Sequence, residues 1–153
     1  MTLVPKAYFV VKGQGESNAS PLNAFDKALW AAGIGHLNLV PVSSIIPPQA
    51  EMVDFREIPP GAITFVVMAS ETGVKGDLIT AGIAWARGEP NGYVLEVHGK
   101  FNEDEARTLL GKMCMDVESY SGIKLLEDWS FMVETLRVEK NYGAVVTALV
   151  FVI

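Results

Sequence analysis

Two adjacent serines, Ser43 and Ser44, are the residues whose setting most favours covalent chemistry. They follow a predicted strand over residues 37–42 and precede two isoleucines and the pair Pro47-Pro48, which cannot continue regular strand pairing. Such surroundings hold a backbone peptide in a fixed geometry. The Ser44 hydroxyl could then attack the carbonyl carbon of Ser43 and convert the peptide bond to an ester. β-Elimination would break the chain, and hydrolysis of the dehydroalanine at position 44 would leave a pyruvoyl group.

Against this interpretation, most serine pairs are ordinary loop residues, and a nucleophilic serine needs an activating neighbour that the local sequence does not display. The other candidate motifs are weaker. The fragments Gly13–Gly15 and Gly33–Gly35 complete neither a dinucleotide-binding fingerprint nor a P-loop, and turns explain them. The two histidines, His36 and His98, have no partner at a spacing typical of a metal site. No metal site and no nucleophile elbow are therefore predicted.

Composition limits the function classes. The chain has 153 residues, of which 50% are hydrophobic and 20% charged, so it has enough apolar mass for one folded domain. The formal net charge of −6 argues against a nucleic-acid partner. No apolar run approaches the ~20 residues of a membrane span. A single cysteine, Cys114, excludes an intrachain disulfide and favours a reducing cytoplasm. The high apolar fraction suggests burial between subunits.

Strand-like segments outnumber helices along the chain. One helix is predicted to begin at Ser20 and Pro21 and to end near Gly33, and a second covers residues 102–120, where Asn102 and Glu105 resemble a capping box. The strand-like segments cover residues 7–12, 37–42, 63–68, 93–97, 123–138 and 144–153, and residues 13–19 are expected to form a loop. The apolar helix positions are Leu22, Phe25, Leu29 and Ala32, and then Ala106, Leu109, Leu110, Met113, Val117 and Tyr120. This pattern predicts a layered α+β domain and not a βαβ repeat.

Four stretches in order along the chain together resemble one family. The segments Pro21–Asp26, Ala32–Leu39 and Val42–Pro48 are similar to the pyruvoyl-dependent arginine decarboxylases. The segment Gly92–Lys100 is similar to the part of that family that bears its catalytic glutamate. The resemblance covers nearly the whole chain with few insertions.

The resemblance implies a fold, an assembly and a maturation. The fold is a four-layer αββα sandwich, and the protomers form a trimer or a dimer of trimers with active sites between neighbouring subunits. Residues 1–153 form a single domain that cleaves itself into a small chain, 1–43, and a large chain, 44–153. The expected protein is cytoplasmic and self-associating, with no nucleic-acid or membrane partner.

Roles follow residue by residue from the same resemblance. Ser44 corresponds to the precursor of the covalent pyruvoyl cofactor and Ser43 to the residue before the cut. Asn38 corresponds to an asparagine that assists processing, by hydrogen bonding to the oxyanion or the ester. Asp26 corresponds to the carboxylate that receives the substrate guanidinium. Glu96 corresponds to the proton donor; from their positions alone, Asp26 and Glu96 are ordinary surface acids.

The implied reaction is decarboxylation of L-arginine to agmatine and CO2, through an imine between the substrate amine and the pyruvoyl group. Glu96 would return a proton to the substrate α-carbon, which requires a raised pKa, most simply through burial. Two alternatives stay open at this point. The chain could be a pyruvoyl-dependent decarboxylase of another amino acid, or an unprocessed trimeric relative without enzymatic activity.

Overall fold

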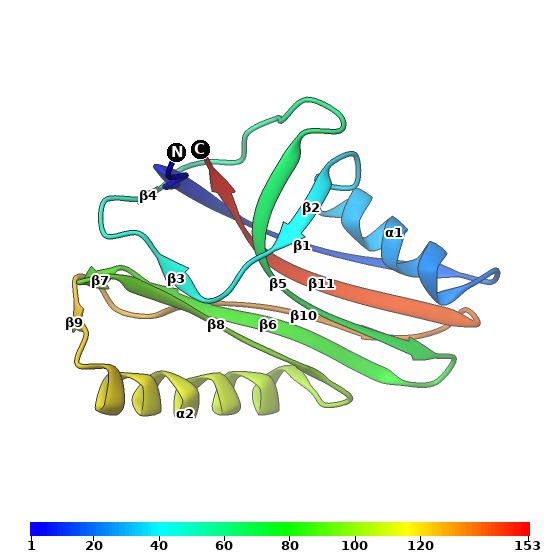
Figure 1. Cartoon of the computed structure of the whole chain (residues 1–153). Coiled ribbons are helices and arrows are strands. Elements are labelled where there is room, and N and C mark those ends of the chain that lie inside the picture. The colour runs from blue at the N-terminus through cyan, green and yellow to red at the C-terminus, as the bar shows by residue number, and fades with distance from the viewer.

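Strands make up most of the fold. The computed structural model describes residues 1–153 and contains two helices and eleven strands (Figure 1). The helices are α1 (Pro21–Ala31) and α2 (Glu103–Ser121). The strands are β1 (Ala7–Ser17), β2 (Asn38–Pro41), β3 (Ile45–Ile46), β4 (Glu51–Met52), β5 (Ile63–Val74), β6 (Leu78–Ala86), β7 (Gly88–Glu89), β8 (Gly92–Gly99), β9 (Lys124–Leu125), β10 (Ser130–Arg137) and β11 (Tyr142–Val152). Neither helix has the length and apolar character needed to span a membrane.

The strands form two main sheets. The first has the order β2-β5-β11-β1-β4, with β1 and β5 antiparallel to β11 and the short edge strands β2 and β4 parallel to their neighbours. The second has the order β10-β6-β8-β3 and is antiparallel throughout. A separate ribbon pairs β7 with β9. This arrangement of two helices and mixed sheets confirms the α+β prediction.

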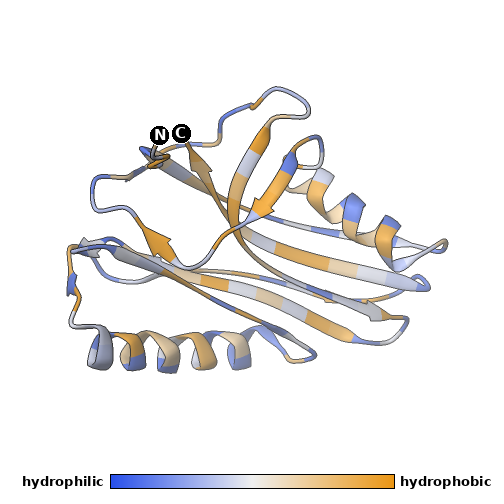
Figure 2. Cartoon of the chain, viewed as in Figure 1, coloured by the Kyte–Doolittle hydropathy of each residue, from blue (hydrophilic) through white to orange (hydrophobic).

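The two sheets pack face to face around one apolar core. Buried side chains from both sheets meet there, among them Tyr8, Ile79, Ile83, Val94 and Leu149. Helix α1 covers the other face of the first sheet and α2 the other face of the second (Figure 1). Hydrophobic residues run along the strands of both sheets (Figure 2). The hydrophobic free energy of burying these faces holds the sheets together.

The sequence prediction was wrong for residues 13–19, because most of them extend β1 and do not form a loop. Strand β1 pairs with β11 along its whole length, from Ala7 opposite Val152 to Ser17 opposite Tyr142. Its two glycines, Gly13 and Gly15, lie directly under α1, where a Cβ atom would collide with the helix backbone. These glycines therefore let the helix approach the sheet closely, which also explains why small residues, Ala24 and Ala28, form the buried face of α1.

The predicted helix ends are confirmed. Ser20 caps α1 by accepting a hydrogen bond from the backbone N–H of Asn23 at 3.0 Å, and Pro21 is the first helical residue. Asn102 accepts from the backbone N–H of Glu105 at 2.8 Å, and the Glu105 side chain completes the capping box.

The predicted apolar faces of the helices are only partly right. Leu22 on α1 and Tyr120 on α2 are 74% and 70% exposed, and Leu109 is also exposed. In α2 the buried residues are Ala106, Leu110, Cys114 and Val117. The prediction was therefore right for Ala106, Leu110 and Val117 and wrong for Leu109 and Tyr120. It missed the small buried residues, which are Cys114 on α2 and Ala24 and Ala28 on α1.

The long strand predicted over residues 123–138 is interrupted. Residues 124–125 pair with β7 in the small ribbon, whereas Ser130–Arg137 pair with β6 in the second sheet. The two pieces have different partners, so the chain must turn between them. Pairing partners of this kind are not visible in local propensity.

Candidate active site

The serine pair lies where the chain crosses between the sheets. Ser43 and Ser44 belong to the connection from β2 to β3, which are edge strands of the first and second sheet respectively (Figure 1). Ser43 is exposed and Ser44 is half-buried. The peptide bond between them therefore lies at the open edge of the two facing sheets.

Both ends of this connection are anchored by hydrogen bonds to the neighbouring strands. The backbone N–H of Val42 donates to the carbonyl of Val66 on β5 at 2.8 Å, and that of Val94 on β8 donates to the carbonyl of Ser44 at 2.8 Å. Just beyond the serines, β3 pairs with β8, with Ile45 opposite Tyr93. No non-glycine residue has a positive φ. The peptide bond between the serines is therefore held by these hydrogen bonds on either side of it, and not by a residue in the left-handed region.

Glu96 lies next to Ser44. The register of β3 on β8 and the hydrogen bond from Val94 place Ser44 opposite Val94. Glu96 is two residues further along β8, so its Cα is a diagonal neighbour of Ser44 at ~7–8 Å, within reach of a long side chain. Val94 contributes to the core between the sheets, and strand alternation puts Glu96 on the same face. The structure thus brings together two residues that are far apart in sequence.

Burial makes the carboxyl group of Glu96 a weaker acid than an ordinary glutamate, with a raised pKa. Its side chain reaches solvent, yet burial of the carboxyl group against the surrounding strands raises its pKa above the ordinary value. Attraction to His98, two residues along the strand, partly offsets the rise. A carboxyl group that keeps its proton at higher pH is a better general acid near neutrality.

Asn38 is not beside the serines. It is the first residue of β2, and ~10 Å of extended chain separates it from Pro41 at the other end of the strand. Its side-chain amide donates to the carbonyl of Gly61 at 2.8 Å, in the turn that precedes β5. Within one chain, the Asn38 amide therefore stabilises this turn.

Asp26 also lies apart from Ser44. It is exposed on α1, which packs on the face of the first sheet that points away from the second. Ser44 and Glu96, by contrast, belong to the edge between the two sheets. A single chain does not bring Asp26 to them.

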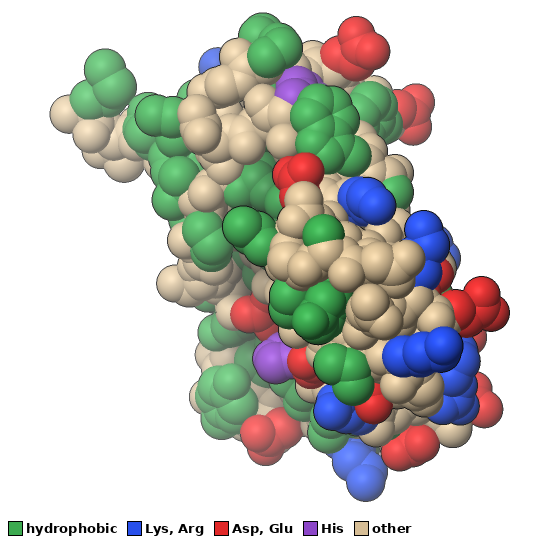
Figure 3. Space-filling view, turned by 90° about the vertical axis from the view of Figure 1, so that its right-hand side faces the viewer, with side chains coloured by type: hydrophobic (Ala, Val, Ile, Leu, Met, Phe, Trp, Pro, Cys, Tyr) green, Lys and Arg blue, Asp and Glu red, His purple; other side chains and the backbone are tan.

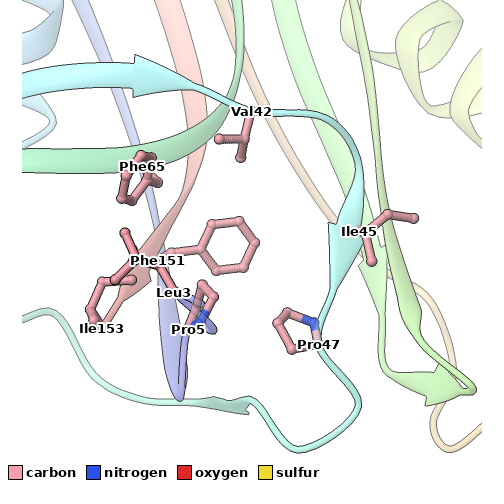
Figure 4. A pocket seen from close by; sticks show the side chains of 8 residues that line it. All are labelled: Leu3, Pro5, Val42, Ile45, Pro47, Phe65, Phe151 and Ile153. Carbon is pink, nitrogen blue, oxygen red and sulfur yellow. The ribbon is translucent and has the colours of Figure 1, made fainter. Parts of the chain in front are cut away.

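The structure adds a cavity that sequence reasoning did not find. It has a volume of about 370 Å³ and adjoins the serine connection, because Val42 and Ile45, on either side of the serines, contribute to its wall (Figure 4). The remaining wall comes from Leu3, Pro5, Pro47, Phe65, Phe151 and Ile153. Residues from both ends of the chain meet here, and no local sequence pattern signals such a contact.

Two buried polar groups have no hydrogen-bond partner in the chain, the indole N–H of Trp85 and the hydroxyl of Thr147. Trp85 lies on β6 directly opposite Val94, so Trp85, Val94 and Ser44 form one row across the second sheet. The buried indole N–H in this row is free to donate a hydrogen bond to a small acceptor group between the sheets.

The lone thiol, Cys114, is buried on the inner face of α2, and burial raises its pKa to about 11, which makes it a poor nucleophile.

The chain is similar to known proteins of one family. The family described as pyruvoyl-dependent arginine decarboxylase matches residues 7–153. The protein of that name from Methanopyrus kandleri is 39% identical over 149 residues, which cover 97% of each chain. Pyruvoyl-dependent arginine decarboxylase 2 from Archaeoglobus fulgidus is 35% identical and covers both chains completely. The Methanothermobacter thermautotrophicus protein is 37% identical over 133 residues, which are 85% of this chain and 86% of the relative. The chain therefore belongs to the pyruvoyl-dependent arginine decarboxylase family.

Proposed function

We propose that this chain cleaves itself between Ser43 and Ser44 and decarboxylates L-arginine to agmatine and CO2 with the pyruvoyl group that forms at position 44. The observation that carries the proposal is the anchored serine pair with Glu96 as its diagonal neighbour at the open edge of the sheets. Membership of a family named for this cofactor and substrate supports it.

Self-cleavage needs only the chain and water. The Ser44 oxygen attacks the Ser43 carbonyl carbon, the peptide nitrogen leaves with a proton, and an ester forms. Loss of the Ser44 α-proton then expels the Ser43 carboxylate and leaves dehydroalanine, which takes up water and releases ammonia. The hydrogen bonds that anchor Val42 and Ser44 hold both sides of the reacting peptide in place. The products are a small chain, 1–43, and a large chain, 44–153.

The surroundings of Ser44 fit a pyruvoyl group. The group would arise from Ser44 itself, and the unpaired Trp85 indole lies in the same row across the sheet and can donate to a carbonyl oxygen. The cavity beside Val42 and Ile45 leaves room for the connection to rearrange after cleavage. A pyruvoyl group supplies a ketone that accepts the substrate amine and takes up the electron pair released with CO2.

The protein side chains bind the substrate and move the proton. Glu96, with its raised pKa, holds a proton close to position 44 and delivers it to the substrate α-carbon after CO2 has left. Asp26 binds the guanidinium group, because a carboxylate accepts paired, charge-assisted hydrogen bonds from that planar group. Asn38 assists the cleavage as a hydrogen-bond donor.

The position of Asp26 supports a site shared between subunits. Because Asp26 and Asn38 lie away from the serine pair of their own chain, we propose that a neighbouring subunit supplies them. The protomer is then a single-domain αββα sandwich that assembles in the cytoplasm as a trimer or a dimer of trimers. Large apolar side chains exposed on α1 and around the β2 edge support this burial. They are Leu22, Trp30, Val40, Val42, Ile45 and Ile63.

An intact-mass spectrum of the denatured protein tests the proposal. We expect two chains, 1–43 and 44–153, the second lighter by one ammonia than a chain that begins with serine. The same sample should release agmatine from arginine. A single uncleaved chain would overturn the proposed maturation, and cleaved protein that prefers another amino acid would overturn the substrate.

Replacing Asp26 with asparagine is expected to raise the KM for arginine roughly 10- to 100-fold, because a hydrogen bond to a charged partner is lost. The measurement is the initial rate of agmatine formation against arginine concentration, with chain cleavage checked by mass. The control is Asp116→Asn, the same change at an exposed position of α2, which should leave KM unchanged. An equal effect of both variants would make Asp26 an ordinary surface residue.

Co-expression tests whether the site is shared. Asp26→Asn chains keep Ser44, and Ser44→Ala chains keep Asp26, so a mixed assembly regains complete sites only if the two residues come from different subunits. We expect activity at low arginine concentration to exceed the sum of the separate variants. No gain in a verified mixed oligomer would place both residues in one subunit.

A further inference from the structure

A side-chain hydrogen bond joins the two sheets beside Glu96. The Nδ1 atom of His98 on β8 lies 3.1 Å from Oε2 of Glu71 on β5. The His98 side chain is 59% exposed and that of Glu71 is 23% exposed. Both histidines of the chain reach the surface seen in Figure 3, and acidic side chains adjoin the lower one. The contact therefore joins a largely buried carboxylate, Glu71, to an imidazole that reaches solvent, His98.

His98 and Glu96 lie on one face of β8. They are two residues apart, which is ~6.6 Å along a strand, so two long side chains at these positions can meet directly or through one water molecule. The attraction between them that lowers the pKa of Glu96 agrees with this proximity. Across from them on β6 are Ile83, opposite Glu96, and Ala81, opposite His98.

The charged groups around this pair are few. Lys100 lies two residues after His98, just past the end of β8, and its Nζ is 3.3 Å from Asp77 in the turn between β5 and β6. From β5 comes Glu71 itself. The facing residues of β6 and those of β3, which are isoleucines, carry no charge. One strand beyond β6, Glu134 on β10 lies opposite Ala81 and so shares a row with His98. His98 is therefore the titratable side chain that follows Glu96 on this face of the strand.

The reaction requires a proton in every turnover. Loss of CO2 from an α-amino acid replaces the C–CO2⁻ bond with a C–H bond, so one proton is consumed for each CO2 released. In the proposed function Glu96 gives this proton and is left as a carboxylate, which must regain a proton before the next substrate reacts. The hydrogen bond to Glu71 occupies Nδ1 of His98, while Nε2 has no hydrogen-bond partner within the chain.

We propose that His98, oriented by Glu71, returns the proton to Glu96 after each turnover. The imidazolium Nε2–H transfers its proton to the Glu96 carboxylate, and the imidazole then takes a proton from solvent. Glu71 is a positioning residue, since its carboxylate holds the His98 ring through Nδ1 and leaves Nε2 free for the transfer. This inference rests on the proposed function, because it needs Glu96 as the proton donor.

The test compares the first turnover with later ones in His98→Gln. Protein prepared at low pH starts with Glu96 protonated, so we expect one agmatine per site at the wild-type rate in a rapid-quench experiment. Later turnovers should be slower by roughly 100-fold, the scale of a lost proton-transfer group. The control is Lys100→Gln, which removes the charged side chain two residues after His98 and should leave the first and later turnovers at the wild-type rate.

A second variant separates proton relay from structure. In His98→Ala, added imidazole should restore the slow phase in proportion to its concentration, because the exposed site admits a small base. An unchanged steady-state rate in His98→Gln, an equal loss in the first turnover, or no rescue by imidazole would overturn the proposal. Failure of the proposed function itself would appear differently, as wild-type protein that is uncleaved or releases no CO2 from arginine.

Discussion

Replacing Ser44 with alanine is expected to leave one uncleaved chain and to abolish arginine decarboxylation. The variant lacks both the oxygen that attacks Ser43 and the carbon atoms that become the cofactor. The fold should persist, because Ser44 is only half-buried and its anchoring hydrogen bond uses the backbone carbonyl. Denaturing mass spectrometry and a CO2-release assay measure the two effects, and the melting temperature reports on the fold.

The matched control is Ser43→Ala. Ser43 contributes its carbonyl carbon to the cleavage, and its exposed side chain is not consumed in any step. This variant should still form two chains and an active enzyme. Cleavage of the Ser44→Ala chain at the same bond would contradict the pyruvoyl mechanism outright.

The second large effect is expected for Glu96→Gln, which should lower kcat by about 10²- to 10⁴-fold while chain cleavage continues. Glutamine keeps the shape of the side chain but has no acidic proton to deliver. Because burial raises the pKa of Glu96, the wild-type carboxyl group is protonated below that pKa and the rate should fall as the pH rises through it. The variant should lack this alkaline limb.

The measurement is kcat and KM for arginine across pH, on protein whose cleavage has been verified. Glu134→Gln is a suitable control, since Glu134 is a half-buried glutamate opposite Ala81 on the same face of the second sheet. We expect its pH profile to match the wild type. Unchanged turnover in Glu96→Gln would remove this residue from the mechanism.

Features with local causes could be predicted from the sequence. The start of α1 at Ser20 and Pro21 and the capping box at Asn102 and Glu105 depend on side chains within one helical turn. The extension of β1 past Gly13 depends instead on its pairing with β11, more than 100 residues away in sequence. A local reading of glycine as a turn residue therefore failed there.

The candidate site also combines features that local sequence predicts with features that depend on distant strand pairing. Ser43 and Ser44 were identified from their neighbours, but the proximity of Ser44 to Glu96 comes from the register between β3 and β8. The contact between Glu71 and His98 joins two sheets, and spacing along the chain gives no sign of it. The roles of Asn38 and Asp26 came only from the family resemblance, and they stay predictions because each lies away from the serines of its own chain.

The position of the cut has a thermodynamic consequence. The segment 1–43 contains β1, α1 and β2, and β1 lies between β11 and β4 within the first sheet. After cleavage, the complete ladder between β1 and β11 would still hold the two polypeptides together. The shorter chain would be part of the first sheet and not a propeptide that is released. Unfolding of a single protomer would then separate two polypeptides, and its refolding would require an encounter between them. Only the uncleaved precursor would fold as one covalent chain. A protomer that unfolds after cleavage would therefore refold less readily than the precursor.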